Sequence, residues 1–526
     1  MTFEAPPFRR VLIANRGEIA VRIIRACHEM GMEAVAIYSD ADAEAAHVRV
    51  ADAAVRVGPP SPAESYLRID AVVAAAIATG SQAIHPGYGF LAERAAFARA
   101  VEEAGLVFVG PPSEAIEALG DKLHARRLAA KIGVPSVPGT LEPAPVDHPD
   151  RAADIVATAT RIGFPLLVKA AAGGGGRGMR RVTRPEDLPA ALVSGSREAL
   201  SAFGDGSVYL EREILPARHI EVQLLGDAHG HVVALGERDC SLQRRHQKLV
   251  EEAPAPGLTE TQRRHLHALA IRLGEAAQLR NAATCEFLYD PDGSFWFLEV
   301  NTRLQVEHGV TELVAGIDIV REQLRIAGGA SLSAAVLAAA ERSATPSSHA
   351  IEVRLSAEDP SRAFGPTPGR IGRWVMASGP GVRVDTALEA GDRVPADYDN
   401  LIAKLMVHAH DHDAAIERLA RALDETEIGG VQTTLPFHRA VAASDAFRRA
   451  DLSTGWVDRN WDGAGARATA ARRALLAVGL AAMEEGSGAP VAMTRDGASP
   501  PRASDPSGNG AWRRGSRAQG VDRWPS

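Results

Sequence analysis

Hydrophobic and polar positions switch between helical and extended periods along the first 115 residues. Residues 9–40 predict a strand (Val11 to Ala14), a turn, an amphipathic helix and a second strand (Ala34 to Tyr38). Two strands joined through a helix form a βαβ unit with a parallel sheet. Further apolar runs, QAIHPGYGFL and GLVFVGPP, continue the pattern. We therefore predict a doubly wound, Rossmann-like α/β domain over residues 1–115.

The pattern changes after this domain. The string LEPAPVDHPD, rich in proline and acidic residues, predicts a connection into a separate lobe, and strands and helices mix from residue 167 to residue 325. ERSATPSSH, near residue 340, predicts a second linker. Beyond residue 462 the composition turns to Ala, Arg, Gly, Pro and Ser, which is typical of a disordered segment.

Acidic side chains gather on a predicted hairpin. Two apolar runs flank the turn DPDG at residues 290–293, with Glu286 on the first strand and Glu299 and Asn301 on the second. A small register adjustment brings the two glutamates side by side. Without a cation such a pair repels itself. Two carboxylates and an amide oxygen suit Mg²⁺, so we predict a metal site here.

Polar residues then recur at every second position from Glu299 to Glu307, in EVNTRLQVE. If the chain is extended here, these side chains share one face above an apolar floor. The solvated edge of an antiparallel sheet would show the same alternation. This segment alone leaves both interpretations open.

Composition narrows the class of protein. With 526 residues, 46% hydrophobic and 24% charged, the chain can form two to four soluble domains. A net charge of −8 gives no electrostatic case for nucleic acid. No run approaches 18 apolar residues and the first residues lack an apolar h-region, so neither a membrane nor an export role is predicted. Three dispersed cysteines predict no disulfide framework, which favours a cytoplasmic location.

Lysine is rare, with five among 58 basic residues, and arginine supplies the rest of the positive charge. A lysine is therefore present either because its position needs a compact ammonium group or through evolutionary drift. Lys169 ends an apolar strand before four consecutive glycines, whose backbone N–H groups can approach a phosphate closely. Glycine runs also form plain hairpins. Lys248 lies in a basic run, residues 238–248, which could be a solvated face or could hold an anion opposite a metal.

The turn after the first predicted strand reads NRGE, at residues 15–18, instead of the G-x-G-x-x-G of a dinucleotide-binding fold. This difference disfavours an oxidoreductase.

Nine strings in order, between about residue 8 and residue 460, resemble the biotin carboxylase family of the ATP-grasp superfamily. They are VLIANRGEIAVRIIRA, AIHPGYGFLAE, GDK, VKAAAGGGGRGMR, ERDCSLQRRHQK, EEAPAP, EFLYDPDGSFWFLEVNTRLQVEH, AEDP and YDNLIAKL. The resemblance implies a Rossmann-like N-terminal domain (1–115), an ATP-grasp domain (116–334) with a mobile lid over about 141–214, a C-terminal α+β biotin carboxylase domain (335–462) and a tail (463–526) expected to be disordered. LSTGWVDRNW and the alanine-rich helix ARRALLAVGLAAM resemble acyl-CoA carboxylase α chains.

The resemblance also implies an activity. Enzymes of this family are ATP-dependent C–N ligases that use ATP, two Mg²⁺ (or Mn²⁺) ions and bicarbonate to carboxylate biotin on a carrier protein through carboxyphosphate. This is the first half-reaction of an acetyl- or acyl-CoA carboxylase. The implied partners are a biotin carboxyl carrier protein supplied in trans, a second copy in a homodimer or larger complex, and a carboxyltransferase subunit. No lysine of this sequence follows a methionine, as the biotinylated lysine of a carrier domain does, so we expect biotin to be supplied from outside this chain.

Roles carry over to matched positions only. Residues implied to bind ATP are Lys122, Lys169, the loop glycines Gly173, Gly174, Gly175, Gly176 and Gly178, Glu211, Ile214, His219, Gln243, His246, Glu286 and Glu299. Those implied to hold the metal ions are Glu286, Glu299 and Asn301. Those implied to act on bicarbonate and biotin are Lys248, Arg303, Gln305, the Val306 backbone, Glu307 as the base and Arg354 beside the biotin enolate.

Two other functions compete with this one. Another ATP-grasp ligase, such as a carbamoyl-phosphate or purine-pathway enzyme, would share the metal carboxylates but not RRHQK or RLQVEH. A silent scaffold would have no reason to keep every expected ligand. The chain departs from the family pattern at Gly309, where proline is common, and at Asn400-Leu401. Cys240 has no evident paired base, which favours a packing role over a nucleophile.

Overall fold

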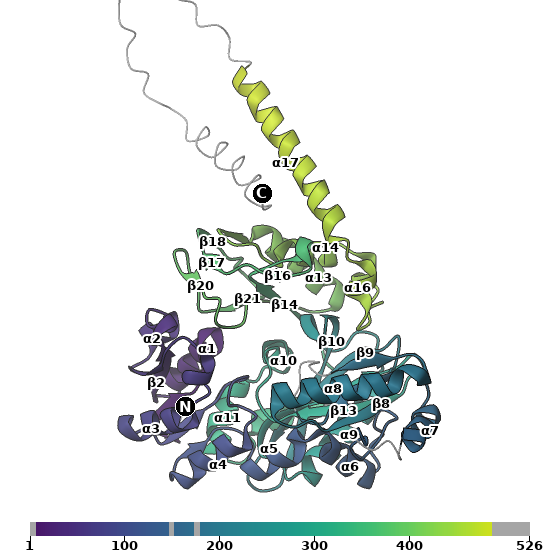
Figure 1. Ribbon diagram of the computed structural model, residues 1–526. Helices are drawn as coiled ribbons and strands as arrows, with labels where there is room; N and C mark the ends of the chain where they lie inside the picture. Colours follow the sequence, from purple (N-terminus) through teal and green to yellow (C-terminus); the bar gives the residue numbers. More distant parts are fainter. Residues whose placement is uncertain (1–6, 147–151, 173–178, 487–526) are drawn as a thin grey trace, which may run out of the picture.

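The computed structural model describes residues 7–146, 152–172 and 179–486 (Figure 1). Its N-terminal part is a five-stranded sheet in the order β3-β2-β1-β4-β5, in which every neighbouring pair is parallel. The doubly wound prediction is confirmed. The elements are β1 (Arg10–Ile13), α1 (Gly17–Glu29), β2 (Glu33–Ser39), α2 (Ala46–Val50), β3 (Ala53–Gly58), α3 (Ile69–Thr79), β4 (Ala83–His85), α4 (Ala95–Glu103), β5 (Val107–Phe108), α5 (Ser113–Gly120) and α6 (Lys122–Lys131).

A small separate sheet follows, with the order β7-β6-β8 and antiparallel pairing. Two helices pack on it through one apolar core that includes Leu166, Val168 and Leu192. This is the region that the sequence predicts to be a lid; its mobility stays a prediction, and the glycine loop 173–178 lies outside the described residues. The elements are α7 (Ala152–Ile162), β6 (Leu166–Ala170), β7 (Arg180–Val182), α8 (Leu188–Phe203) and β8 (Val208–Arg212).

An eight-stranded sheet, in the order β13-β12-β9-β10-β11-β14-β21-β19, forms the centre of the molecule. The predicted linker near residue 340 is a loop between α12 and β14. Because β14 pairs with β11, strands before and after this loop belong to the same sheet. The elements are β9 (Arg218–Gly226), β10 (Val232–Arg244), β11 (Gln247–Ala253), α9 (Glu260–Ala276), β12 (Asn281–Tyr289), β13 (Phe295–Asn301), α10 (His308–Ala315), α11 (Ile319–Ala327), α12 (Ala334–Arg342), β14 (His349–Ser356), β19 (Val382–Thr386) and β21 (Leu401–Ala409).

Helices α13 and α14 cover one face of β14 and β21 and share with them a core that contains Ile351, Leu405 and Leu419. Helix α10 packs on the other face, where Val310 contacts Ala350 and Met406 in a second, smaller core. The remaining elements are β15 (Glu358–Asp359), β16 (Gly365–Pro366), β17 (Gly369–Arg370), β18 (Arg373–Val375), β20 (Arg393–Val394), α13 (His412–Glu425), β22 (Glu427–Gly429), α14 (Leu435–Ala442), α15 (Asp445–Arg448), α16 (Trp456–Asn460) and α17 (Gly463–Gly486).

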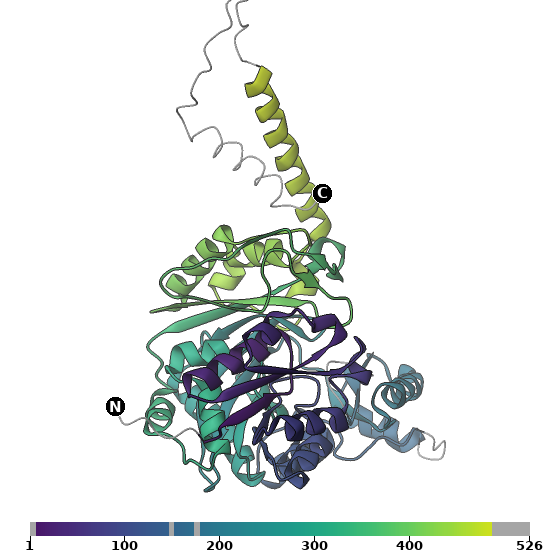
Figure 2. The ribbon, with the colours of Figure 1, turned by 90° about the vertical axis from the view of Figure 1, so that its left-hand side faces the viewer.

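Helix α17 projects away from the rest of the protein (Figures 1 and 2). The prediction of disorder is wrong for residues 463–486, because alanine, leucine and arginine are strong helix formers and here outweigh the scattered glycines. The predicted alanine-rich helix lies within α17. Residues 487–526 of the predicted tail lie outside the described residues. No helix among residues 7–146, 152–172 and 179–486 is long and apolar enough to cross a membrane.

The departure at Gly309 has a packing explanation. A Cβ atom added to Gly309 would lie 2.3 Å from the sulfur of Met406, a residue that is fully buried on β21. The Met406 side chain therefore fills the space that a larger residue at position 309 would need.

We expect Gly309→Ala to lower the free energy of unfolding by about 1–3 kcal/mol, the usual cost of overpacking a core. Met406→Ala should lower the free energy of unfolding less in the Gly309→Ala variant than in the wild-type chain, because the alanine side chain introduced at position 309 and the Met406 side chain compete for one space. Gly479→Ala, on α17 with no atom within 4 Å of the added Cβ, is the control and should be neutral or slightly stabilising. Urea or thermal unfolding measures all four variants; strict additivity would contradict this explanation.

Candidate active site

A lateral row of charged residues crosses the eight-stranded sheet. Arg238 on β10 lies opposite Glu221 on β9, Glu221 lies opposite Glu286 on β12, and Glu286 lies opposite Glu299 on β13. Register partners point to the same face, so three carboxylates stand side by side on adjacent strands. The predicted hairpin and its register adjustment, found between Glu286 and Phe287, are confirmed. Because adjacent carboxylates repel, this row requires cations.

Lys248 on β11 supplies the central cation. Its Nζ atom contacts Glu221 and lies 3.0 Å from Glu286 Oε1 and 2.7 Å from Glu307 Oε1. Burial alone would lower the pKa of Lys248, but these three carboxylates raise it well above its ordinary value. The ammonium therefore stays charged while buried.

The chain leaves the extended conformation at Asn301, where β13 ends, and α10 begins at His308. The condition for a shared face, an extended chain from Glu299 to Glu307, therefore holds only as far as Asn301. Residues 302–307 instead form a turn that places Glu307 directly before α10 and in contact with Lys248. Lys404 Nζ donates to the Val306 carbonyl oxygen at 3.0 Å, which holds this turn in place.

Glu307 is fully buried, and both of its carboxylate oxygens face a cation. Oε1 faces Lys248, and Oε2 lies 3.0 Å from Arg354 Nη2. Arg354 also donates from Nε to Glu251 Oε1 at 2.6 Å. The Cys240 thiol lies 3.9 Å from Glu307 Oε1, and burial raises the pKa of Cys240 well above its usual range, so the thiol stays protonated. This excludes a thiolate nucleophile and leaves a shielded carboxylate between two cations.

A polar network joins this carboxylate region to the acidic row. Arg303 donates from Nη1 to Gln305 Oε1 at 2.9 Å and from Nη2 to Asn301 Oδ1 at 3.2 Å. Asn301 Nδ2 and Gln305 Nε2 in turn donate to Glu286 Oε1 at 2.8 and 3.1 Å. Arg303 Nε also pairs with Glu93 of the N-terminal domain at 2.9 Å. The structure thus brings together residues that the sequence assigned to bicarbonate and to metal.

The residues predicted to contact ATP lie at the β13 side of the row and on the small sheet. Lys122 Nζ is 2.8 Å from Glu299 Oε2. Lys169 on β6 pairs with Glu211 on β8, and Arg126 Nη1 donates to the same glutamate at 2.8 Å. Glu211 is therefore held by two cations.

Four further predicted residues lie near this region. Ile214 is half-buried in the connection between β8 and β9. His219 Nε2 lies 3.1 Å from Glu286 Oε2; burial would lower the pKa of His219, but Glu286 raises it to about 9. Gln243 pairs in register with Lys248, and His246 lies in the β10–β11 turn.

Two carboxylates and one amide have the chemistry to hold a hard cation. Glu286 and Glu299 are cross-strand partners, and Asn301 follows on the same face two residues later. Burial would raise the pKa of Glu286, but Lys248 and His219 hold it at about 2, so it is ionised as a ligand must be. Oxygen donors in this number and charge fit Mg²⁺ shared with substrate phosphates.

Sequence reasoning missed several residues of the site. Their common feature is that each pairs with a predicted residue from a strand or helix far away in the sequence. They are Glu93, Arg126, Glu221, Glu251 and Lys404. The alternation of HIEVQ in β9 was a usable signal for Glu221, and the rarity of lysine was a usable signal for Lys404.

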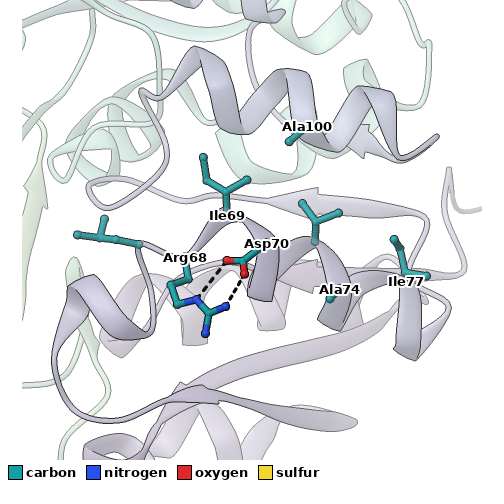
Figure 3. Close-up of a pocket in the computed structure, with 8 residues that line it drawn as sticks. Arg68, Ile69, Asp70, Ala74, Ile77 and Ala100 are labelled. Atoms are coloured by element: carbon teal, nitrogen blue, oxygen red, sulfur yellow. Dashed lines mark hydrogen bonds and ion pairs between the residues drawn. The ribbon is translucent and has the colours of Figure 1, made fainter.

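A groove on the outside of the N-terminal domain is separate from this site. Residues of α3, together with Ala100 of α4, line it, and Arg68 pairs there with Asp70 (Figure 3). None of the predicted site residues lines the groove. It therefore takes no part in the chemistry considered below.

Three family models match the chain. They are the biotin carboxylase N-terminal domain over residues 7–116, the carbamoyl-phosphate synthase L chain ATP-binding domain over residues 121–335 and the biotin carboxylase C-terminal domain over residues 352–459. Together they cover most of the described residues. An α/β protein with a parallel N-terminal sheet and an ATP-grasp core is the class that the fold and the site define.

Curated relatives and solved structures agree with this class. The biotin carboxylase of Pseudomonas aeruginosa is 45% identical over 450 residues, which cover 86% of this chain and 98% of that protein. The biotin carboxylase of Halalkalibacterium halodurans is 46% identical over 450 residues, which cover 86% and 97%. A Campylobacter jejuni biotin carboxylase structure has a TM-score of 0.82 at 42% identity and covers 87% of this chain and 99% of its own. The chain therefore belongs to the biotin carboxylase family.

One further structure bears on ligands. The biotin carboxylase domain of Hydrogenobacter thermophilus 2-oxoglutarate carboxylase, solved with MgADP, ADP and bicarbonate, has a TM-score of 0.81 at 42% identity and covers 86% of this chain and 97% of its own.

Proposed function

We propose that this protein catalyses the ATP- and bicarbonate-dependent carboxylation of biotin on a carrier protein. The observation that carries the proposal is the buried Glu307, held between Lys248 and Arg354. A shielded carboxylate with one cation on each oxygen suits a base that removes a proton from a small anion, because the same cations attract that anion.

The proposed sequence of steps follows from these positions. Bicarbonate binds between Lys248, Arg303, Gln305 and the Val306 backbone, and Glu307 accepts its proton. The resulting oxygen attacks the γ-phosphorus of ATP and displaces ADP, which forms carboxyphosphate. Carboxyphosphate breaks into CO₂ and phosphate; phosphate takes the ureido proton of biotin, and the enolate adds to CO₂ while Arg354 neutralises its charge.

The chain's own residues position the nucleotide in this proposal. Lys122 and Lys169 neutralise ATP phosphates after leaving Glu299 and Glu211, and phosphoryl transfer depends on such cations more than on covalent help. Glu286, Glu299 and Asn301 would hold Mg²⁺ or Mn²⁺, which supplies further positive charge at the phosphates. Closure of residues 141–214 would keep water from carboxyphosphate.

Bicarbonate-dependent release of ADP, with and without free biotin, tests the proposal. We expect slow release that needs bicarbonate and Mg²⁺ and that rises when biotin is added. Another ATP-grasp ligase would show no response to biotin. A silent scaffold would release no ADP.

The proposed assembly extends to partners. Relatives are named as carboxylase subunits, among them a biotin-dependent acyl-coenzyme A carboxylase alpha3 subunit from Mycobacterium leprae. We propose a carboxyltransferase partner that selects the final acceptor, an acetyl- or acyl-CoA, and a homodimer or larger complex in the cytoplasm. In this proposal the transferase selects the acceptor, because the half-reaction assigned to this chain ends at carboxylated biotin.

Biotin should be attached outside these 526 residues. The five lysines are Lys122, Lys131, Lys169, Lys248 and Lys404; none follows methionine, all lie in helices or strands of the folded chain, and four of them take part in the charge network of the site. Co-expression with an active biotin ligase should leave the intact mass of this chain unchanged. A biotin carrier protein expressed in the same cells is the positive control and should gain one biotin. A gain of one biotin by this chain would overturn the proposal.

A further inference from the structure

Three potential metal ligands meet at a place that the proposed reaction does not use. They are Glu252 on β11, His349 at the start of β14 and His412 at the start of α13. Glu252 Oε2 lies 3.0 Å from His349 Nε2 and 3.0 Å from His412 Nε2, and the three ligating atoms all lie within 4.8 Å of one another. Glu252 and His349 are buried, while the His412 side chain is 22% exposed.

The sheet separates this cluster from the active site. Glu251 lies opposite Glu352 and contacts Arg354, so it faces the Glu307 side. Adjacent residues of a strand point to opposite faces, so Glu252 faces the other side, together with its register partner Ile351. Ile351 belongs to the core beneath α13 and α14.

The remaining two side chains reach the same face. His349 precedes Ile351 by two residues on β14, so the two share a face. His412 is held at the first turn of α13 because the Asp411 side chain caps the helix through Ala414 N at 2.8 Å. Two strands and one helix therefore fix the three ligands independently.

We propose that Glu252, His349 and His412 form a binding site for a first-row divalent metal ion such as Zn²⁺. Two imidazoles and one carboxylate are a ligand set that suits Zn²⁺, Co²⁺ or Ni²⁺ and not Mg²⁺, which prefers oxygen. Metal–ligand bonds of about 2.0–2.2 Å place neighbouring ligand atoms roughly 3 Å apart, as found for Glu252 Oε2 with each imidazole.

Two properties of the cluster support the proposal. Among the described residues His412 Nε2 has no hydrogen-bond partner, although it lies 3.0 Å from Glu252 Oε2, so its orientation does not suit a simple hydrogen bond. The second property is that one carboxylate oxygen, Glu252 Oε2, lies 3.0 Å from an imidazole nitrogen of each histidine. An ion here would tie β11 and β14 to α13 and stabilise the folded chain in proportion to its occupancy.

Titration of the full chain with Zn²⁺ tests the site. After removal of metals with a chelator, isothermal titration in excess Mg²⁺ should show one tight Zn²⁺ equivalent per chain, and Co²⁺ should give the visible absorption of a site with two imidazoles. His412→Ala should weaken binding at least about 10-fold and keep ADP release unchanged, since the residue is partly exposed and far from the reaction. His410→Ala, with a side chain that is 80% exposed, is the matched control and should bind as the wild type does.

Two results would overturn the proposal. One is absence of a stoichiometric Zn²⁺ site in a chain that is folded and releases ADP. The other is equal affinity in the wild type and His412→Ala, which would place the ion at the active-site group His219, Glu221 and Glu286 instead. In either case the cluster is only a buried carboxylate that contacts two imidazoles. Neither result bears on the proposed carboxylation, which the ADP assay measures separately.

Discussion

Glu307→Gln is expected to lower the kcat of biotin carboxylation by about 10²- to 10⁴-fold, the usual contribution of a general base. The amide keeps the shape of the side chain but cannot accept the bicarbonate proton. KM for ATP should change little, because Lys122 and Lys169 contact other carboxylates. Bicarbonate-dependent ADP release at saturating ATP measures the effect.

Glu312→Gln is a matched control for this variant. Glu312 lies in α10, which begins directly after Glu307, and is also buried, but it pairs with Arg22 and Arg383 and not with Lys248. We expect Glu312→Gln to lower the melting temperature and to retain kcat. If Glu307→Gln retains kcat and only KM for ATP rises, the role of base belongs to another group.

Arg354→Ala is expected to reduce biotin carboxylation by about 10²- to 10³-fold while ATP affinity falls much less, as for the loss of one charge-stabilising donor. Arg354 is the shared cation of Glu307 and Glu251, and both carboxylates are fully buried. Its removal should also cost about 3–5 kcal/mol of stability, because the buried Glu307 and Glu251 lose the cation that they share.

Arg354→Lys separates charge from geometry. Lysine keeps the positive charge but lacks the fork that reaches two carboxylates at once, so activity should fall between that of the wild type and that of Arg354→Ala. Comparing kcat for biotin with the Kd for ATP in both variants measures the distinction. If kcat for biotin and affinity for ATP fall by the same factor, Arg354 has a role in folding only.

The sequence predicted features that depend on neighbouring residues. The hairpin around DPDG, with Glu286 beside Glu299, follows from turn chemistry and alternation, and it is present with the expected register shift. The parallel N-terminal sheet follows from periodicity in the same way. Recognised strings then pointed to Lys248, Arg303 and Glu307, which do lie together.

What could not be predicted depends on strand order. Glu221 faces Glu286 only because β9 lies between β12 and β10, and nothing local in the sequence places β9 there. The alternation from Arg303 to Glu307 has the period of a strand, yet residues 302–307 form a turn into α10. Period two in a polar loop and period two in a strand are indistinguishable without the partner strand.

Cutting the chain near residue 345 would split the eight-stranded sheet between β11 and β14, even though this point lies between two matched family models. The backbone N–H and C=O groups of residues 250–253, which now pair with β14, would then form an open strand edge. Open edges are templates for pairing with other chains, so an isolated N-terminal fragment should self-associate or precipitate. Mixed with the complementary fragment, it should reassemble along the β11–β14 edge and beneath α10, which restores the Arg354–Glu251 contact.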